Sequence, residues 1–429
     1  MTSDGNGAIG YLFGLEKFGM RLGLENVTEL LERLGNPHNE FKSVHVAGTN
    51  GKGSVCAYVS SILQEAGYKV GLYTSPHLVR LNERIQINGE EISDDGMEEL
   101  AERIRAVSEE MASESPDKQI TFFEFLTAMA FSHFRDENID FGVLEVGLGG
   151  RLDATNVVTP EVCAIAHLAI EHSEHLGGSF GQIAEEKAGI IKDGVPVVVS
   201  DNPVPKAVSD VCKEKNASLT VVGKDVVFSK TEQEPDWQHI RLNDMHDIKI
   251  GLHGHHQVQN AATAFGVIEA MRAKGFEIPH KAVSAGFSKA KWPGRFEVVM
   301  RNPLVVLDTA HNPDAATELR RSVDDVLEYD RGILVLGMLE DKDMEGFAAE
   351  IYTIVSTVIC TTPQNPRALP AERATEIMKK YIRRVGPLSS VAEAMDKALD
   401  MAREEDMILV TGSNTTVGEA MQYLERVNK

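Results

Sequence analysis

A glycine-rich run near the start of the chain contains the residue types that bind phosphate. An apolar segment, residues 43–47, leads directly into Gly48-Thr49-Asn50-Gly51-Lys52-Gly53-Ser54, and helical periodicity follows from Gly53. Glycines let backbone N–H groups close around phosphate oxygens, a lysine adds a mobile positive charge, and a hydroxyl can bind Mg²⁺. The spacing is not that of the standard Walker A motif, because Gly53 separates Lys52 from Ser54. The run predicts a phosphate-binding loop between a strand and a helix.

Two further polar residues follow expected strands in the same way. Glu145 ends the apolar segment 141–145, and Ser75 comes just after the apolar segment 70–73. The carboxyl ends of parallel strands meet at the edge where open α/β sheets bind ligands. Carboxylate and hydroxyl oxygens also suit a hard cation. We therefore expect both residues beside the phosphate loop. The alternatives are an exposed acid in a turn for Glu145 and an ordinary Ser-Pro turn for Ser75.

Alternating strand-like and helical segments must position these residues. Short β-branched runs predict buried strands at 43–47, 70–73, 141–145, 163–167 and 195–200. Helical periodicity lies between them at 53–66, 94–111, 122–137 and 182–191. Such alternation is typical of a doubly wound, mostly parallel sheet.

The pattern changes after Ser218. Four closely spaced segments predict a small antiparallel patch, at 219–222, 226–229, 238–242 and 248–252. Pro293 and Gly294 mark a boundary, and a second series of strands and helices begins at Phe296. We therefore expect an α/β protein with two domains. Residues 1–295 would form a large, P-loop ATPase-like, doubly wound domain with the antiparallel patch, and residues 296–429 a smaller Rossmann-like α/β domain.

Composition limits the partners. The 429 residues include 43 Lys+Arg and 65 Asp+Glu, a formal net charge of −22. This acidity argues against nucleic acid and against anionic membranes, although a local pocket can still be positive. No apolar run approaches the roughly 18 residues of a transmembrane helix, and no signal peptide is visible. The four cysteines form no CxxC pair, so a reducing cytoplasmic setting is expected.

Several ordered motifs resemble one known family. Besides the phosphate loop, the runs are Tyr73-Thr74-Ser75-Pro76-His77-Leu78, Asn82-Glu83-Arg84-Ile85, residues 144–156, residues 186–191, the Trp292–Arg295 turn and Asp341-Lys342-Asp343. Together they are similar to the folylpolyglutamate synthase/dihydrofolate synthase branch of the Mur ligase superfamily. Cell-wall Mur ligases carry a further domain ahead of the loop, and the loop here begins at Gly48, which favours the folate branch.

The resemblance implies ATP-dependent amide formation. L-glutamate would be added to dihydropteroate, to tetrahydrofolyl-(poly)glutamate, or to both, through an acyl phosphate with release of ADP and phosphate. Two Mg²⁺ sites are implied, together with a possible monovalent cation. ATP, L-glutamate and the pterin or folate are the implied partners, and the expected state is a monomer.

The resemblance also assigns roles to residues. The implied catalytic residues are Lys52, Glu145, His172 and Lys187, and the implied metal ligands are Ser54, Ser75, Glu145, His172 and a carbamylated Lys187. The implied ATP-binding residues are Thr49, Asn50, Gly51, Lys52, Gly53, Ser54, Asn260, Arg295, Asp308 and His311. The implied pterin-binding residues are Thr121, Phe122, Phe123, Glu124, Leu152, Asp153 and Ala154. A helix start with core aromatics explains Phe122 and Phe123 equally well.

Three departures from the family pattern leave alternatives open. They are the run from His167 to Gly178, Thr309 where a glycine is usual, and residues 414–416. They motivate a second hypothesis, a ligase of the same superfamily that joins a different carboxylate or amine. A nucleotide-binding protein without catalysis is a third, and the presence of the expected site residues argues against it.

Overall fold

The larger domain is built on an eight-stranded sheet. The computed structural model describes residues 7–19, 21, 23–170, 179–234 and 237–427. The strand order is β4-β3-β2-β5-β1-β6-β7-β8. The strands are β1 (Lys42–Ala47), β2 (Val70–Tyr73), β3 (Ile85–Ile87), β4 (Glu90–Glu91), β5 (Phe141–Glu145), β6 (Val162–Ile165), β7 (Val197–Val199) and β8 (Leu219–Val221). From β2 to β8 in this order all neighbours are parallel, whereas β3 and β4 form an antiparallel edge.

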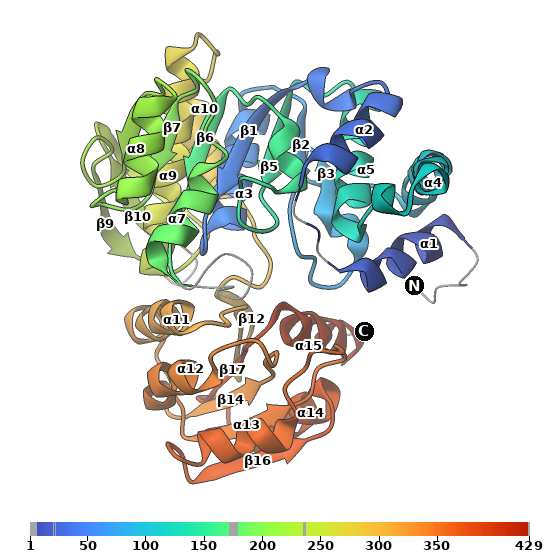
Figure 1. The fold of residues 1–429 in the computed structure, drawn as a ribbon. Helices are drawn as coiled ribbons and strands as arrows, with labels where there is room; N and C mark the ends of the chain where they lie inside the picture. The colour runs from blue at the N-terminus through green and yellow to red at the C-terminus, as the bar shows by residue number, and fades with distance from the viewer. Residues whose placement is uncertain (1–6, 20, 22, 171–178, 235–236, 428–429) are drawn as a thin grey trace.

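Helices cover both faces of this sheet (Figure 1). On one face, Val143 of β5 belongs to the core formed with α3 (Lys52–Glu65), α9 (His255–Ala273) and α10 (His280–Lys289). On the other face, Leu144 packs with α1 (Ala8–Gly14), α2 (Glu25–Arg33), α4 (Asp94–Glu114) and α5 (Phe122–Asp136). The same face continues under α7 (Phe180–Ala188) and α8 (Lys206–Glu214). The near-continuous apolar strands follow from this double coverage.

The antiparallel patch is smaller than the sequence predicts. It contains only β9 (Phe228–Gln233), β10 (Gln238–Leu242) and β11 (Met245–Ile250). The prediction that residues 219–222 belong to it is wrong, because β8 pairs in parallel with β7 and extends the large sheet. Neighbouring parallel strands need a crossover of about a dozen or more residues. The segment that contains α8 supplies this crossover between β7 and β8.

The smaller domain has a six-stranded sheet with the order β12-β13-β17-β14-β15-β16. The strands are β12 (Glu297–Arg301), β13 (Leu304–Leu307), β14 (Gly332–Leu336), β15 (Thr357–Thr361), β16 (Arg384–Leu388) and β17 (Met407–Thr411), and only β12 runs antiparallel to its neighbour. One face packs on α11 (Pro313–Val326), α12 (Met344–Ile351) and α13 (Ala371–Met378), and the other on α14 (Val391–Met401) and α15 (Asn414–Val427). This confirms the expected two-domain α/β class.

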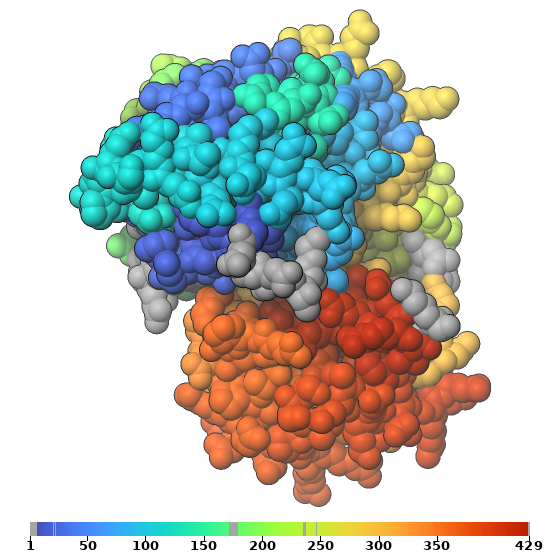
Figure 2. All heavy atoms as spheres, turned by 90° about the vertical axis from the view of Figure 1, so that its right-hand side faces the viewer, coloured from blue at the N-terminus to red at the C-terminus, as the bar shows by residue number. Residues whose placement is uncertain are grey.

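The two domains face each other across a narrow boundary. Figure 2 shows them as two lobes, with the smaller domain in orange and red below the larger one. The chain crosses between them at the turn that joins α10 to β12. Within the described residues, no helix is both long enough and apolar enough to cross a membrane.

Candidate active site

The phosphate loop lies where β1 ends and α3 begins. Gly51 caps α3 with a φ of 88°, a left-handed conformation that favours glycine. The backbone N–H groups of Thr49 and Asn50 donate to the carbonyl of His167 at 2.9 and 3.1 Å, which fixes the loop against the segment after β6. Lys52 Nζ donates to the Thr49 carbonyl at 3.3 Å. The amides of the first turn of α3 have no intrahelical acceptors, so this end of the helix favours an anion.

Glu145 and Ser75 lie side by side at the same edge of the sheet, as predicted. The backbone N–H of Ser75 donates to Glu145 Oε2 at 3.1 Å. Glu145 is buried, and burial raises the pKa of its carboxyl, while the positive charges of Lys52 and Arg295 act in the opposite direction. Among the described residues, no basic side chain lies within ion-pair distance of this carboxylate. A buried carboxylate near positive charges is suited to a divalent ion.

The remaining predicted metal ligands are distributed around the loop. Ser54 is buried in the first turn of α3, where its Oγ accepts from Gln257 Nε2 at 3.1 Å. Lys187 is buried on α7, and its Nζ donates to the carbonyl of Gly48 at 2.7 Å. His172 lies outside the described residues. Oxygen donors from Glu145, Ser54 and Ser75 fit Mg²⁺, which keeps several waters and binds through few carboxylates. No group of three His, Cys, Asp or Glu side chains able to hold a metal occurs in the described part of the chain.

Asn260 connects α9 to the phosphate loop. Its Nδ2 donates to Gln257 Oε1 at 3.1 Å, and Gln257 in turn reaches Ser54. A Cβ on Gly51 would lie 2.3 Å from Asn260 Oδ1, so only glycine allows this approach. These contacts therefore fix the position of the phosphate loop relative to the start of α9.

The predicted nucleotide residues of the second domain gather at the domain junction. Buried Asp308 accepts from the backbone N–H groups of Phe296 and Ala310, each at 2.8 Å, and burial raises the pKa of its carboxyl. Arg295 donates to the hydroxyl of Thr309, and His311 Nδ1 lies 2.8 Å from the Thr309 carbonyl. Thr309, the unusual residue of this turn, thus contacts both basic side chains.

Most predicted pterin residues have a local structural partner. Thr121 and Glu124 cap α5 reciprocally, with Glu124 Oε2 accepting from the Thr121 N–H at 2.8 Å. Asp153 accepts from the Leu148 N–H at 2.9 Å and from the Thr155 N–H at 3.0 Å. Leu152 and Ala154 flank it in the same turn, and Ala154 is buried. Thr121 and Glu124 therefore fix the start of α5, and Asp153 fixes the glycine-rich turn after Glu145.

The aromatic pair divides between two roles. The Phe123 ring stacks on Tyr73 with centroids 6.0 Å apart, and a Cβ on Gly147 would lie 2.4 Å from Phe123 Cζ. Phe122 is partly buried, and the Arg84 guanidinium lies 5.6 Å from its ring centroid. Phe123 therefore packs with β2 and the turn after β5, while Phe122 presents a flat surface beside a cation.

Sequence reasoning assigned no role to Arg84. Its Nε donates to His77 Nδ1 at 2.9 Å, and burial lowers the pKa of His77 to about 4, so the imidazole is a neutral acceptor. Burial also lowers the pKa of Arg84 itself. Only the match of residues 82–85 to a family motif pointed to this arginine, because its surroundings come from three separate elements.

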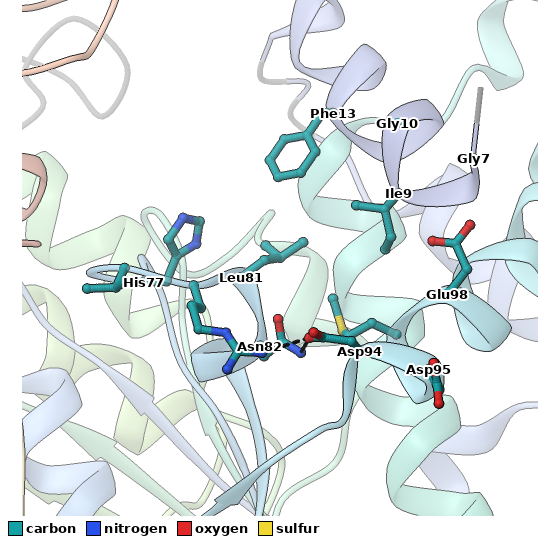
Figure 3. A pocket seen from close by; sticks show the side chains of 13 residues that line it. Gly7, Ile9, Gly10, Phe13, His77, Leu81, Asn82, Asp94, Asp95 and Glu98 are labelled. Atoms are coloured by element: carbon teal, nitrogen blue, oxygen red, sulfur yellow. Dashed lines mark hydrogen bonds and ion pairs between the residues drawn. The ribbon is translucent and has the colours of Figure 1, made fainter. Parts of the chain in front are cut away.

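A cavity of about 470 Å³ opens next to His77. Figure 3 shows His77 and Leu81 on one side of it, Phe13 and Ile9 of α1 on another, and acidic side chains at the start of α4. The Arg80 guanidinium and Asp94 form an ion pair at 2.7 Å within its wall. The cavity lies on the larger domain, outside the phosphate loop.

Comparisons with known proteins agree with this geometry. The Mur ligase middle domain family matches residues 46–268, and the Mur ligase glutamate ligase domain family matches residues 294–414. A dihydrofolate synthase/folylpolyglutamate synthase of Escherichia coli is 37% identical over 418 residues, covering 97% of this chain and 94% of the relative. The chain belongs to the folylpolyglutamate synthase/dihydrofolate synthase branch of the Mur ligase superfamily.

Solved structures of this branch share the whole fold. A Mycobacterium tuberculosis folylpolyglutamate synthase complexed with ADP has a TM-score of 0.90 at 31% identity, covering 97% of this chain and 98% of its own. E. coli FolC in complex with DHPP and ADP has a TM-score of 0.88 at 34% identity, covering 100% of both chains. A bifunctional folylpolyglutamate synthase/dihydrofolate synthase with Mn, AMPPNP and L-glutamate bound has a TM-score of 0.85 at 34% identity, covering 99% of this chain and 100% of its own.

Proposed function

We propose that this chain is an ATP-dependent ligase that adds L-glutamate to dihydropteroate, to tetrahydrofolyl-(poly)glutamate, or to both. One observation carries the proposal. The phosphate loop, Glu145 and Ser75 meet at one edge of the sheet, where Asn50 of the loop contacts Asn312 and Asp314 of the second domain, just after His311. ATP bound at the loop would therefore lie between the domains. Full-length similarity to folate ligases supports the substrate class and disfavours a different acid or amine.

The residues can perform the two chemical steps of an acyl-phosphate mechanism. The substrate carboxylate attacks the γ-phosphorus of ATP, the bond to the β–γ bridging oxygen breaks, and ADP leaves. The amine of glutamate then attacks the acyl carbon, loses a proton and expels phosphate. Both steps increase negative charge on phosphoryl or acyl oxygens, so Lys52, Arg295 and the amides of the loop stabilise them.

Mg²⁺ supplies further charge neutralisation when it is bound. We propose two sites, with Ser54, Ser75 and Glu145 at the first and His172 and a carbamylated Lys187 at the second. A bound Mn in a related structure supports a divalent ion in this branch. The contact from Lys187 to the Gly48 carbonyl supports a role for this lysine at the phosphate loop. The proposal also includes a monovalent cation in addition to the two Mg²⁺ ions.

Carbamylation can be tested without turnover. Carbon-13 NMR of the protein in ¹³C-bicarbonate should show one carbamate signal that is lost in Lys187→Arg. An unchanged spectrum in that variant would refute the assignment.

Arg84 is proposed to bind an acidic or electron-rich part of the pterin substrate. It lies over Phe122 and donates to a neutral histidine rather than to a carboxylate, so a ligand anion can approach it. Phe122, with Thr121, Phe123, Glu124 and the turn Leu152–Ala154, would then form the wall for the flat ring.

The domain division 1–295 and 296–429, and the monomer, are part of the proposal. Two separate apolar cores on either side of the 292–297 turn support the division. The test of function is ADP release with ATP, Mg²⁺ and L-glutamate, supplying dihydropteroate and tetrahydrofolyl-glutamate separately. Absence of release with both pterins would refute the substrate assignment, and unchanged release in Lys52→Ala would refute the site.

A further inference from the structure

His167 lies between two carboxylates that belong to different domains. It follows β6, and its Nδ1 is 2.6 Å from Asp201 Oδ1, in the segment after β7. Its Nε2 is 3.3 Å from Asp314 Oδ2, in the first turn of α11 of the second domain. A neutral imidazole has one N–H and can donate to only one of them. Two carboxylate partners therefore require the imidazolium.

The charges around this group favour the imidazolium. Asp201 and Asp314 together raise the pKa of His167 to about 10. His256 of α9 also faces Asp314, but burial and the charge of Arg295 lower its pKa to about 4, so it is neutral. Among the described titratable groups, His167 is thus the cation that faces Asp314.

The same residues hold the phosphate loop. Asp314 Oδ2 also accepts from Asn50 Nδ2 at 2.7 Å, and Asn312 Nδ2 donates to Asn50 Oδ1 at 3.3 Å. The His167 carbonyl accepts from the N–H groups of Thr49 and Asn50. His167 therefore binds the loop through its backbone and the second domain through its side chain.

We propose that His167 is a positioning residue, a fixed positive charge that joins α11 of the second domain to the phosphate loop. The His167–Asp314 contact holds the domains so that Lys52 and the nucleotide residues of the second domain face one ATP. Two domains joined at one turn move relative to each other unless contacts of this kind restrain them. The inference rests on the proposed function only for the identity of the bound nucleotide.

The other end of α11 offers a matched control. Asp325 lies in the last turn of the same helix and contacts Lys230 of β9 across the domain boundary at 3.6 Å. Asp325→Asn makes the same chemical change in the same helix as Asp314→Asn. Because the Asp325 side chain is more exposed than that of Asp314 and lies at the far end of α11 from the phosphate loop, loss of its contact should have little effect.

The test compares Asp314→Asn, His167→Gln, their double variant and Asp325→Asn. We expect Asp314→Asn and His167→Gln each to raise the KM for ATP, and the dissociation constant of ADP measured by calorimetry, about tenfold. Asp325→Asn should stay within twofold of wild type. The double variant should be no worse than either single variant, because the contact is already lost. In the pH profile of kcat/KM for ATP, the alkaline limb should move to lower pH in Asp314→Asn. In this variant only Asp201 still raises the pKa of His167.

Two results would overturn the proposal. One is equal behaviour of Asp314→Asn and Asp325→Asn, and the other is multiplication of the two single effects in the double variant. Thermal unfolding of each variant separates a folding defect from a positioning defect. The affinity for ADP and the radius of gyration in solution can both be measured without an acceptor acid. They therefore test the domain contact independently of which acid the chain ligates. If wild type ligates no folate while Asp314→Asn still weakens ADP binding, the proposed function fails and the inference stands.

Discussion

Gly51→Ala tests whether the close approach of the phosphate loop to α9 matters for nucleotide binding. Gly51 has a φ of 88°, where an alanine costs about 1–2 kcal/mol. Its new Cβ would also lie 2.3 Å from Asn260 Oδ1, so the loop or Asn260 must move. Losing one hydrogen bond to a charged phosphate costs about 1.5–3 kcal/mol. ADP binding should therefore weaken about 10- to 150-fold.

Gly67→Ala is a control that separates the cost of a left-handed backbone at alanine from the displacement of Asn260. Gly67 has a comparable φ of 95°, and a Cβ there meets nothing within 4 Å. Urea unfolding should show a loss of about 1–2 kcal/mol for Gly67→Ala and a loss at least as large for Gly51→Ala, whose Cβ also meets Asn260. Calorimetry should show weakened ADP binding only for Gly51→Ala. If Gly51→Ala binds ADP within twofold of wild type, the argument from the Asn260 contact is wrong.

Three other substitutions have defined outcomes. Arg84→Met should raise the KM for the pterin acid about tenfold or more by removing a charged hydrogen bond, with ADP affinity unchanged by calorimetry. The stabilising effect of His167 should be complete below about pH 6.5 and be lost as pH rises toward 10. Chemical denaturation should therefore show the stability difference between wild type and His167→Gln shrinking over that range. Phe141→Ala should lower the free energy of unfolding by about 3–5 kcal/mol, because its buried ring packs between Tyr68 and Phe276.

The predictable parts of the site are those set by local sequence pattern or by the general geometry of a parallel sheet. The strand, glycine turn and helix around Lys52 follow from local pattern, and parallel strands bring Ser75 to Glu145 by the general geometry of the sheet. The second sheet was predictable in β14, β15 and β17 for the same reason, since buried parallel strands are apolar throughout.

The sequence analysis did not predict strands β3, β4 and β16, and the residues of each strand show why. Gly386 and Pro387 in β16 resemble a turn, and the sheet tolerates them because β16 is an edge strand. Asn88-Gly89 is a hairpin signal between β3 and β4, and both residues have positive φ. The strands it joins are too short to show an alternating pattern.

Contacts that depend on docking were beyond sequence reasoning. His167 and Asp314 are 147 positions apart and meet only because the two domains pack together. The environment of Arg84 likewise depends on burial beside His77 and Phe122. Neither residue type nor spacing contains that information.

Transfer of oxygen from the substrate acid to phosphate tests the central claim most directly. Dihydropteroate labelled with ¹⁸O in its carboxylate is incubated with ATP, Mg²⁺ and L-glutamate, and the released phosphate is analysed by mass spectrometry. The proposed acyl phosphate predicts one ¹⁸O atom in phosphate for each glutamate added, with ADP as the nucleotide product. Unlabelled phosphate, or label in AMP, would contradict it.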